Sequence, residues 1–137
     1  MKNSLRLTAL FPMILLLCSC ASSTEKPFFN IEDSLVIKGY DVIGPVTSIN
    51  NYRINGWSYV SDKFVIINTG VRDHYLVGFR NSCHEAQSAS RVGFSNTAGR
   101  LTTSDKMIVE GVGGFDGHCI IESLTRLEKA RKEDKDE

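Results

Sequence analysis

Residues 64–79, FVIINTGVRDHYLVGF, decide the fold of this chain. Two short runs within it, residues 64–67 and 75–79, are rich in the β-branched and aromatic residues that favour strands. Residues 68–73 between them contain the Asn, Gly and Asp that are typical of turns. The stretch therefore predicts an antiparallel hairpin, with His74 beside the turn and exposed to solvent.

A second pair of apolar runs lies further along the chain. Residues 107–109 and 119–121 are joined by the glycine-rich segment 111–117, which predicts another hairpin. Several short strands with turn signals between them indicate a mainly β fold, a small antiparallel sheet or barrel with one short helix. The further predicted elements are strands at residues 35–37, 46–52 and 92–95, and a short helix at residues 84–89.

The composition is that of a single globular domain. Of the 137 residues, 42% are hydrophobic and 23% are charged, and 16 Lys and Arg balance 16 Asp and Glu. These fractions are ordinary for a folded domain. Because affinity for nucleic acid comes mainly from clustered Lys and Arg that neutralise phosphates, a neutral chain without such a cluster is not expected to bind nucleic acid.

The first 19 residues have the three parts of a secretory signal peptide. Lys2 and Arg6 give a positive start, residues 9–18 form an apolar run, and small residues follow. A membrane-spanning helix needs about 20 apolar residues, so this run is too short to cross a bilayer. We therefore expect residues 1–19 to be cleaved after export.

Residues 17–20, Leu-Cys-Ser-Cys, resemble the lipobox of bacterial lipoproteins, which places an aliphatic residue three positions before the acylated cysteine and a small residue directly before it. Cys20 meets both requirements, whereas Cys18 follows Leu17. The resemblance implies a diacylglycerol on the Cys20 sulfur and a three-chain anchor, which attaches stably to a membrane. Ala21 stands where an aspartate would retain a lipoprotein in the inner membrane, so the outer membrane, facing the periplasm, is implied. An ordinary signal peptide, giving a diffusible periplasmic protein, is the alternative.

The remaining chain divides into three parts. Residues 20–34 begin small and polar and contain Pro27, as expected of a lipid anchor and tether. Residues 35–124 hold the apolar runs and are predicted to form the β-rich periplasmic domain. Residues 125–137 are dominated by charge and predict a solvated tail or a frayed helix, because such a segment buries too little apolar surface to offset its ordering entropy.

Two cysteines lie in the predicted domain, Cys83 and Cys119. In an oxidising periplasm an even pair in a small domain is most simply a disulfide. Closing its loop of about 37 residues contributes roughly 3.5 to 4 kcal/mol in the chain-entropy description. The adjacent His84 and His118 offer a Cys2His2 metal site as an alternative, and free thiols are the third. Adjacent residues on a strand point to opposite faces, and paired zinc ligands are normally two to four residues apart, so the spacing favours the bridge without a metal or other cofactor.

Several features follow one another in a set order along residues 48–125. They are Trp57 and Asp62 before the strand 64–67, Tyr75-Leu76 before Cys83, the segments 91–95 and 97–101, Ser104-Asp105 before residues 107–109, and residues 119–121. This order resembles a family of small exported bacterial proteins, many of them lipoproteins, classed as a domain of unknown function. The resemblance implies a compact β-rich periplasmic domain with a cysteine pair and no activity to carry over. His118 departs from the family pattern, which weakens the metal alternative.

Groups that could carry catalysis are present but follow no known pattern. Serines could act as nucleophiles, and His74, His84 and His118 as bases, with aspartates to orient them. The sequence has no Gly-x-Ser-x-Gly elbow, and segment 111–117 lacks the Walker lysine of a phosphate-binding loop. We therefore expect a protein that is not an enzyme. An envelope hydrolase, and a metal-handling lipoprotein that uses the Cys and His pairs, are the alternatives.

Three side chains are candidates for a binding surface. Trp57, with two tyrosines nearby, could stack on a glycan or a peptide, although core packing is the more frequent role of such a residue. Arg91 and Arg100 flank a polar segment and could hold an anion or a peptide, or form an ordinary ion pair. The sequence thus predicts a lipid-anchored envelope protein with a binding or structural role, whose partners are membrane lipid through Cys20 and an envelope protein or glycan.

Overall fold

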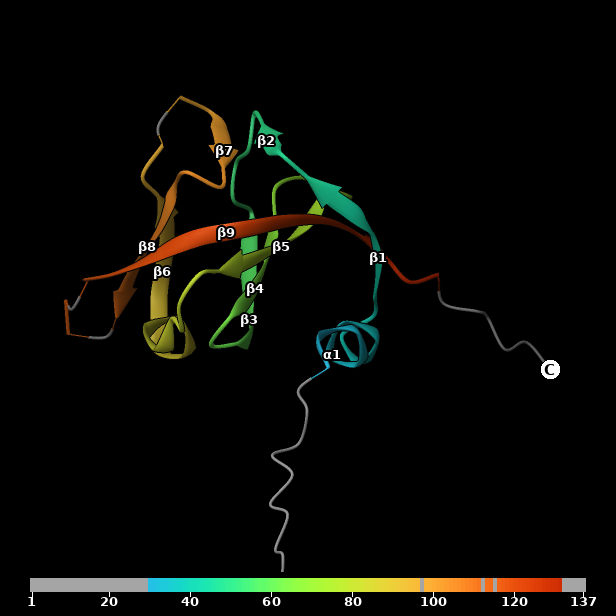
Figure 1. The fold of residues 1–137 in the computed structure, drawn as a ribbon, viewed down its shortest axis with the longest axis horizontal. Coiled ribbons are helices and arrows are strands. Elements are labelled where there is room, and N and C mark those ends of the chain that lie inside the picture. Colours follow the sequence, from blue (N-terminus) through green and yellow to red (C-terminus); the bar gives the residue numbers. More distant parts are fainter. Residues whose placement is uncertain (1–29, 97, 112, 115, 132–137) are drawn as a thin grey trace, which may run out of the picture.

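The computed structural model describes residues 30–131, apart from residues 97, 112 and 115 (Figure 1). The predicted signal peptide 1–19, the predicted lipidation at Cys20 and residues 21–29 of the predicted tether lie outside the described residues. Within the described part, no helix is both long and apolar enough to cross a membrane. The elements in chain order are α1 (Ile31–Ile37), β1 (Tyr40–Val46), β2 (Ser48–Asn50), β3 (Gly56–Ser61), β4 (Phe64–Asn68), β5 (His74–Phe79), the 3-10 helix η1 (His84–Ser88), β6 (Ala89–Phe94), β7 (Arg100–Thr102), β8 (Lys106–Gly111) and β9 (Asp116–Lys129).

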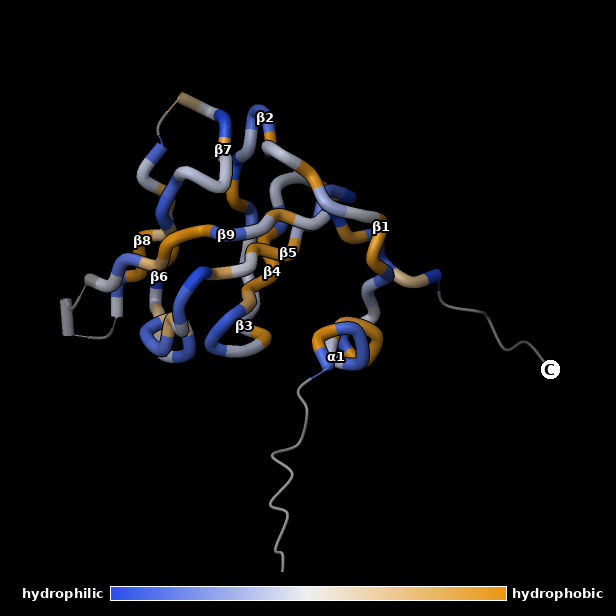
Figure 2. Tube along the Cα trace, viewed as in Figure 1, coloured by the Kyte–Doolittle hydropathy of each residue, from blue (hydrophilic) through white to orange (hydrophobic). Residues whose placement is uncertain are grey.

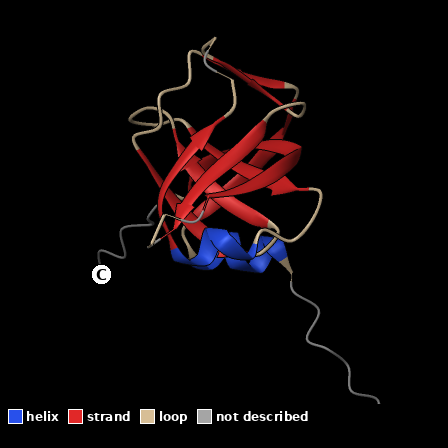
Figure 3. Cartoon of the chain, turned by 90° about the vertical axis from the view of Figure 1, so that its left-hand side faces the viewer, coloured by secondary structure: helices blue, strands red, loops and turns tan. Residues whose placement is uncertain are grey.

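The long strand β9 is the centre of the main sheet, whose order is β3-β4-β5-β9-β8-β6. β5 pairs with one edge of β9, and the other edge pairs first with β8 and then with β1. The two-stranded β2–β7 sheet lies at the top of Figure 1, between the β1 and β8 sides. All these pairs are antiparallel, and the strands curve around one another into a nearly closed sheet (Figure 3). The predicted mainly β fold is therefore confirmed.

The alternation of side chains on the strands creates two apolar layers. Val65 and Ile67 of β4 point into the curved sheet and belong to its main core. Ile66 of β4 and Leu76 of β5 point to the opposite face, where Leu35 of α1 packs against them. A strand that is buried on both faces reads as a continuous apolar run rather than an alternating one, which explains the composition of residues 64–67.

Both predicted hairpins are present. β4 and β5 pair from Phe64 opposite Gly78 to Asn68 opposite His74. β8 and the first part of β9 pair from Lys106 opposite Ile120 to Glu110 opposite Asp116. The predicted strand at 92–95 is β6, and the predicted helix at 84–89 is η1.

The predicted strand at residues 35–37 is wrong, because these residues end helix α1. The Asn30 side chain accepts a hydrogen bond from the Glu32 backbone N–H at 3.0 Å, which caps the helix at its start. Ile31 and Leu35 are one helical turn apart and both join the layer over β4 and β5. Helix α1 therefore begins inside the segment 20–34 that is predicted to be a tether.

The folded region also extends further at its other end than predicted. β9 continues to Lys129, so the first five residues of the predicted charged tail, 125–129, belong to a strand. Both edges of this part of β9 are paired, with β5 and with β1, and Leu127 is 1% exposed beneath α1. The pairing orders the backbone although the intervening side chains are charged. The predicted strand at 46–52 is likewise divided, since β1 ends at Val46 and β2 covers only Ser48–Asn50.

Candidate functional site

The disulfide between Cys83 and Cys119 is present, with its two Cα atoms 5.7 Å apart. Cys83 directly precedes η1, and Cys119 lies on β9; both are buried in the main core. The backbone N–H of Cys83 also donates to the Asp62 carbonyl at 2.6 Å. The bridge and this hydrogen bond fasten η1 to the β3–β4 turn on one side and to β9 on the other.

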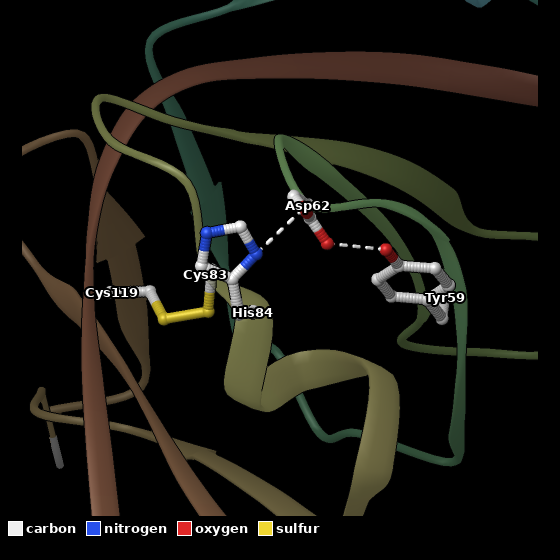
Figure 4. The surroundings of a disulfide bond; sticks show 5 residues. All are labelled: Tyr59, Asp62, Cys83, His84 and Cys119. Carbon is white, nitrogen blue, oxygen red and sulfur yellow. Dashed lines mark hydrogen bonds and ion pairs between the residues drawn. A yellow bond between two sulfur atoms is a disulfide. The ribbon is translucent and has the colours of Figure 1, made fainter.

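A polar chain lies beside the disulfide, as Figure 4 shows. The Tyr59 hydroxyl donates to Asp62 Oδ1 at 2.5 Å, and His84 Nδ1 lies 2.7 Å from Asp62 Oδ2. Tyr59 comes from β3, Asp62 from the β3–β4 turn and His84 from the first residue of η1. The disulfide ties the start of η1 to β9, and the backbone hydrogen bond from Cys83 to Asp62 holds it beside the β3–β4 turn, so the two together position His84 relative to the carboxylate.

The hydrogen bonds of Asp62 shift the acidity of the groups around it. The hydrogen bond from Tyr59, followed by His84, holds the pKa of Asp62 below its usual value. The same hydrogen bond raises the pKa of Tyr59 to about 12, because the phenol would lose it on ionisation beside a carboxylate. At neutral pH Tyr59 is therefore a phenol and Asp62 a carboxylate, and a carboxylate beside a histidine ring is an arrangement that can orient a general base.

The exposure of His84 argues against its use as a catalytic base. Its side chain is 74% exposed and that of Asp62 is 38% exposed, so water competes for both partners. An orienting carboxylate in a hydrolase is normally buried, where the low dielectric strengthens its interaction with the imidazole. The geometry is that of a surface hydrogen-bonded pair.

The residues of the alternative metal site are separated by the strand. Cys119 is buried, whereas His118 is exposed on the opposite face of β9, as the alternation of a strand requires. The Glu85 carboxylate lies within 4.8 Å of both sulfurs. Because those sulfurs are bonded to each other, they are not thiolate ligands in this structure.

Trp57, Arg91 and Arg100 lie on three different strands, β3, β6 and β7. Trp57 is partly buried and packs against the main core. Arg91 is 82% exposed and pairs with Glu110 at 3.8 Å, beside a hollow of about 500 Å³ on the outer face of β6 and β8. Neither Trp57 nor Arg100 borders that hollow, so the structure does not bring the three candidates into one site.

The prediction that His74 is exposed is wrong, because only 4% of its surface is accessible. It begins β5 and faces the α1 side, where its ring lies edge-on to Tyr40 with the centroids 5.2 Å apart. Nδ1 lies 2.6 Å from Asn68 Oδ1. Burial, with a further contribution from Lys129, lowers the pKa of His74. The alternation of His74 with Leu76 on β5 was the available signal for this buried face.

The neighbourhood of His74 contains a second candidate site. A hollow of about 320 Å³ is bordered by His74, Val71, Arg72, Glu128 and Lys129. Its volume is at the lower end of the range for small-molecule sites. Its rim carries two cations and one carboxylate, so it has no strong preference for the charge of a ligand.

The comparisons with known proteins give a family without an assigned activity. The model of a family of unknown function, DUF6491, matches residues 1–137. The chain belongs to this family. No curated protein and no solved structure matches the chain. Membership in the DUF6491 family therefore leaves the function to be argued from the residues themselves.

Proposed function

We propose that this DUF6491 protein is an exported, lipid-anchored protein of the bacterial envelope, which acts by binding or structural association in the periplasm and not by catalysis. The observation that carries the proposal is the Cys83–Cys119 disulfide in the core of the domain. Disulfides of this kind persist in oxidising compartments such as the periplasm and are rare in the cytosol. The signal-like residues 1–19 and the lipobox-like residues 17–20 supply the matching route of export.

The polar groups support a role without catalysis. The Asp62–His84 pair is exposed to solvent, so water competes with each group for the other. Trp57 takes part in core packing, so the surface hollows and the exposed apolar side chains are the proposed ligand surface.

Lipidation is tested by metabolic labelling of cells with an alkyne analogue of palmitate. The wild type and a Cys18→Ser variant should both incorporate the label, because both retain Cys20, the cysteine that fits the lipobox. A Cys20→Ser variant should not incorporate it. Label that depends on Cys18, or no label on the wild type, would contradict the lipid anchor.

The absence of hydrolase activity is tested with a fluorophosphonate probe, which reacts covalently with activated serines. The oxidised wild-type protein should remain unlabelled. Labelling that disappears in a His84→Ala variant would instead support the envelope hydrolase, because it would show that His84 activates a nucleophile.

A further inference from the structure

The most exposed large hydrophobic side chains gather at one end of the molecule. Val36 and Ile37 at the end of α1 are 67% and 84% exposed, and Val42 and Ile43 on β1 are 48% and 55% exposed. Val71, in the turn between β4 and β5, is 92% exposed. We call these five residues the apolar end. Exposed apolar side chains that cluster in this way mark an interaction surface more often than scattered ones do.

The elements that carry the apolar end contact one another. α1 leads directly into β1, and Gly39 between them accepts a hydrogen bond from the backbone N–H of Ala130 at 2.9 Å. Tyr40, the first residue of β1, packs on His74, which follows the β4–β5 turn. Ile43 and Arg72 border one hollow of about 230 Å³. Figure 2 shows the hydrophobic colouring of α1 and β1 on the same side of the molecule.

Two of the apolar side chains are followed directly by a cation. Lys38 follows Ile37, and Arg72 follows Val71, and both cations are exposed. An aliphatic residue followed by a basic one suits a bilayer surface, because the aliphatic side chain enters the hydrocarbon region of the bilayer while the long basic side chain reaches the lipid phosphates. Asp41 and Glu128 lie close by, so the charge around the apolar end is nearly balanced. Insertion of the apolar groups, and not attraction to anionic lipid, would therefore drive binding.

The position of the apolar end follows from the length of chain that precedes α1. Only the nine residues 21–29 separate Cys20 from Asn30, which caps α1. A fully extended chain spans at most about 3.5 Å per residue, so Asn30 stays within roughly 35 Å of the anchored cysteine. Ile37 lies seven residues further along α1, which is about 10 Å of helix. The exposed apolar side chains are thus held near the surface that the anchor enters.

We propose that the apolar end docks on the lipid bilayer and fixes the orientation of the domain on the membrane. The proposal rests on the proposed lipidation of Cys20, because the short tether makes docking an intramolecular step at high effective concentration. Docking places α1, β1 and the β4–β5 turn against lipid. The strands β6 and β8 and the β7–β8 turn, which lie on the side of Figure 1 opposite α1 and β1, then face away from the lipid.

Docking is tested on the full-length lipoprotein, purified from membranes and reconstituted in phosphatidylcholine vesicles. A Val71→Trp variant places a tryptophan at the apolar end, and a Thr103→Trp variant places one on the exposed β7–β8 turn as a matched control. The wild type, with Trp57 alone, supplies the background. Lipids brominated on their acyl chains should quench the fluorescence at position 71 and leave that at position 103 unchanged. Replacing part of the phosphatidylcholine with phosphatidylglycerol should change neither result.

A second variant measures the strength of docking. Ile37→Ser in the Val71→Trp protein should lower the ratio of docked to undocked domains about tenfold, because burial of one aliphatic side chain contributes approximately that factor. Equal quenching at positions 71 and 103 would overturn the proposal. So would shielding of position 71 that is accompanied by dimers in detergent, because a second copy would then cover the apolar end. Intact mass separates the two claims: a protein without acyl chains refutes the lipid anchor, whereas an acylated protein without quenching refutes only docking.

Discussion

Removal of the Cys83–Cys119 bridge should cost about 4 kcal/mol of unfolding free energy. The two cysteines are 36 positions apart, and the loss of loop-closure entropy in the unfolded chain gives approximately this value at 25 °C. The cost is of the order of the entire stability of a small domain, which is typically about 5–15 kcal/mol. The variant to use is Cys83→Ala with Cys119→Ala, because single replacements leave a buried free thiol that can form mixed disulfides.

Urea denaturation followed by far-UV circular dichroism measures the effect, and a reductant supplies the control. Reduction should lower the unfolding midpoint of the wild type to near that of the double variant and leave the double variant unchanged. Equal midpoints for the wild type with and without reductant, at full reduction of its thiols, would refute the view that the bridge stabilises the domain.

Three further predictions concern packing and titration. Gly78→Ala should destabilise the domain by about 1–3 kcal/mol, because the added Cβ would clash with the side chains of Ser123 and Phe64. Gly93→Ala is the control: the space at its Cβ is open, so its urea midpoint should be close to that of the wild type. Because the pKa of Asp62 is lowered in the folded state, its carboxylate contributes stability above the unfolded pKa, and this contribution is lost as pH falls through the folded pKa. Tyr59→Phe removes the hydrogen bond that lowers this pKa, so it should flatten the acid dependence of the urea midpoint between about pH 2 and 5. An unchanged dependence would contradict the assigned hydrogen bond. Because the pKa of His74 is lowered in the folded state, the folded domain binds fewer protons there than the unfolded chain, and its stability should fall as pH drops below about 6.5. An NMR titration of the His74 imidazole should show a midpoint below that value. A midpoint above it would refute the effect of burial.

The two hairpins of the main sheet could be predicted from sequence because their local signals agree with the final structure, whereas β3 and nearly all of β1 fall outside the predicted strands. Residues 64–79 contain two strand-forming runs and a turn, and β4 and β5 pair with each other directly. The disulfide could be predicted because the domain contains two cysteines, which leave a single pairing. These features depend on composition and short-range order.

The ends of the domain could not be predicted because long-range pairing defines them. Leu124 and Leu127 lie among charged residues, and only the simultaneous pairing of β9 with β5 and β1 makes this segment a strand. Residues 35–37 have strand-like composition, yet the cap at Asn30 and the packing of Leu35 on the sheet select a helix. Local propensity is overridden in both segments by tertiary contacts.

The site residues show the same limit. The side chains of Tyr59, Asp62 and His84 meet because the backbone hydrogen bond from Cys83 to Asp62 holds the start of η1 beside the β3–β4 turn, a contact that no local pattern reveals. Trp57 and Arg91 were selected by residue type, and the structure places them on different strands with different neighbours.

The mass of the native protein extracted from bacterial membranes tests the central claim of export and anchoring most directly. A non-reducing intact mass, with peptide mapping, should show a chain that begins at a triacylated Cys20 and carries a Cys83–Cys119 bridge. A chain that begins at Met1, without acyl groups and with both domain cysteines reduced, would contradict the account.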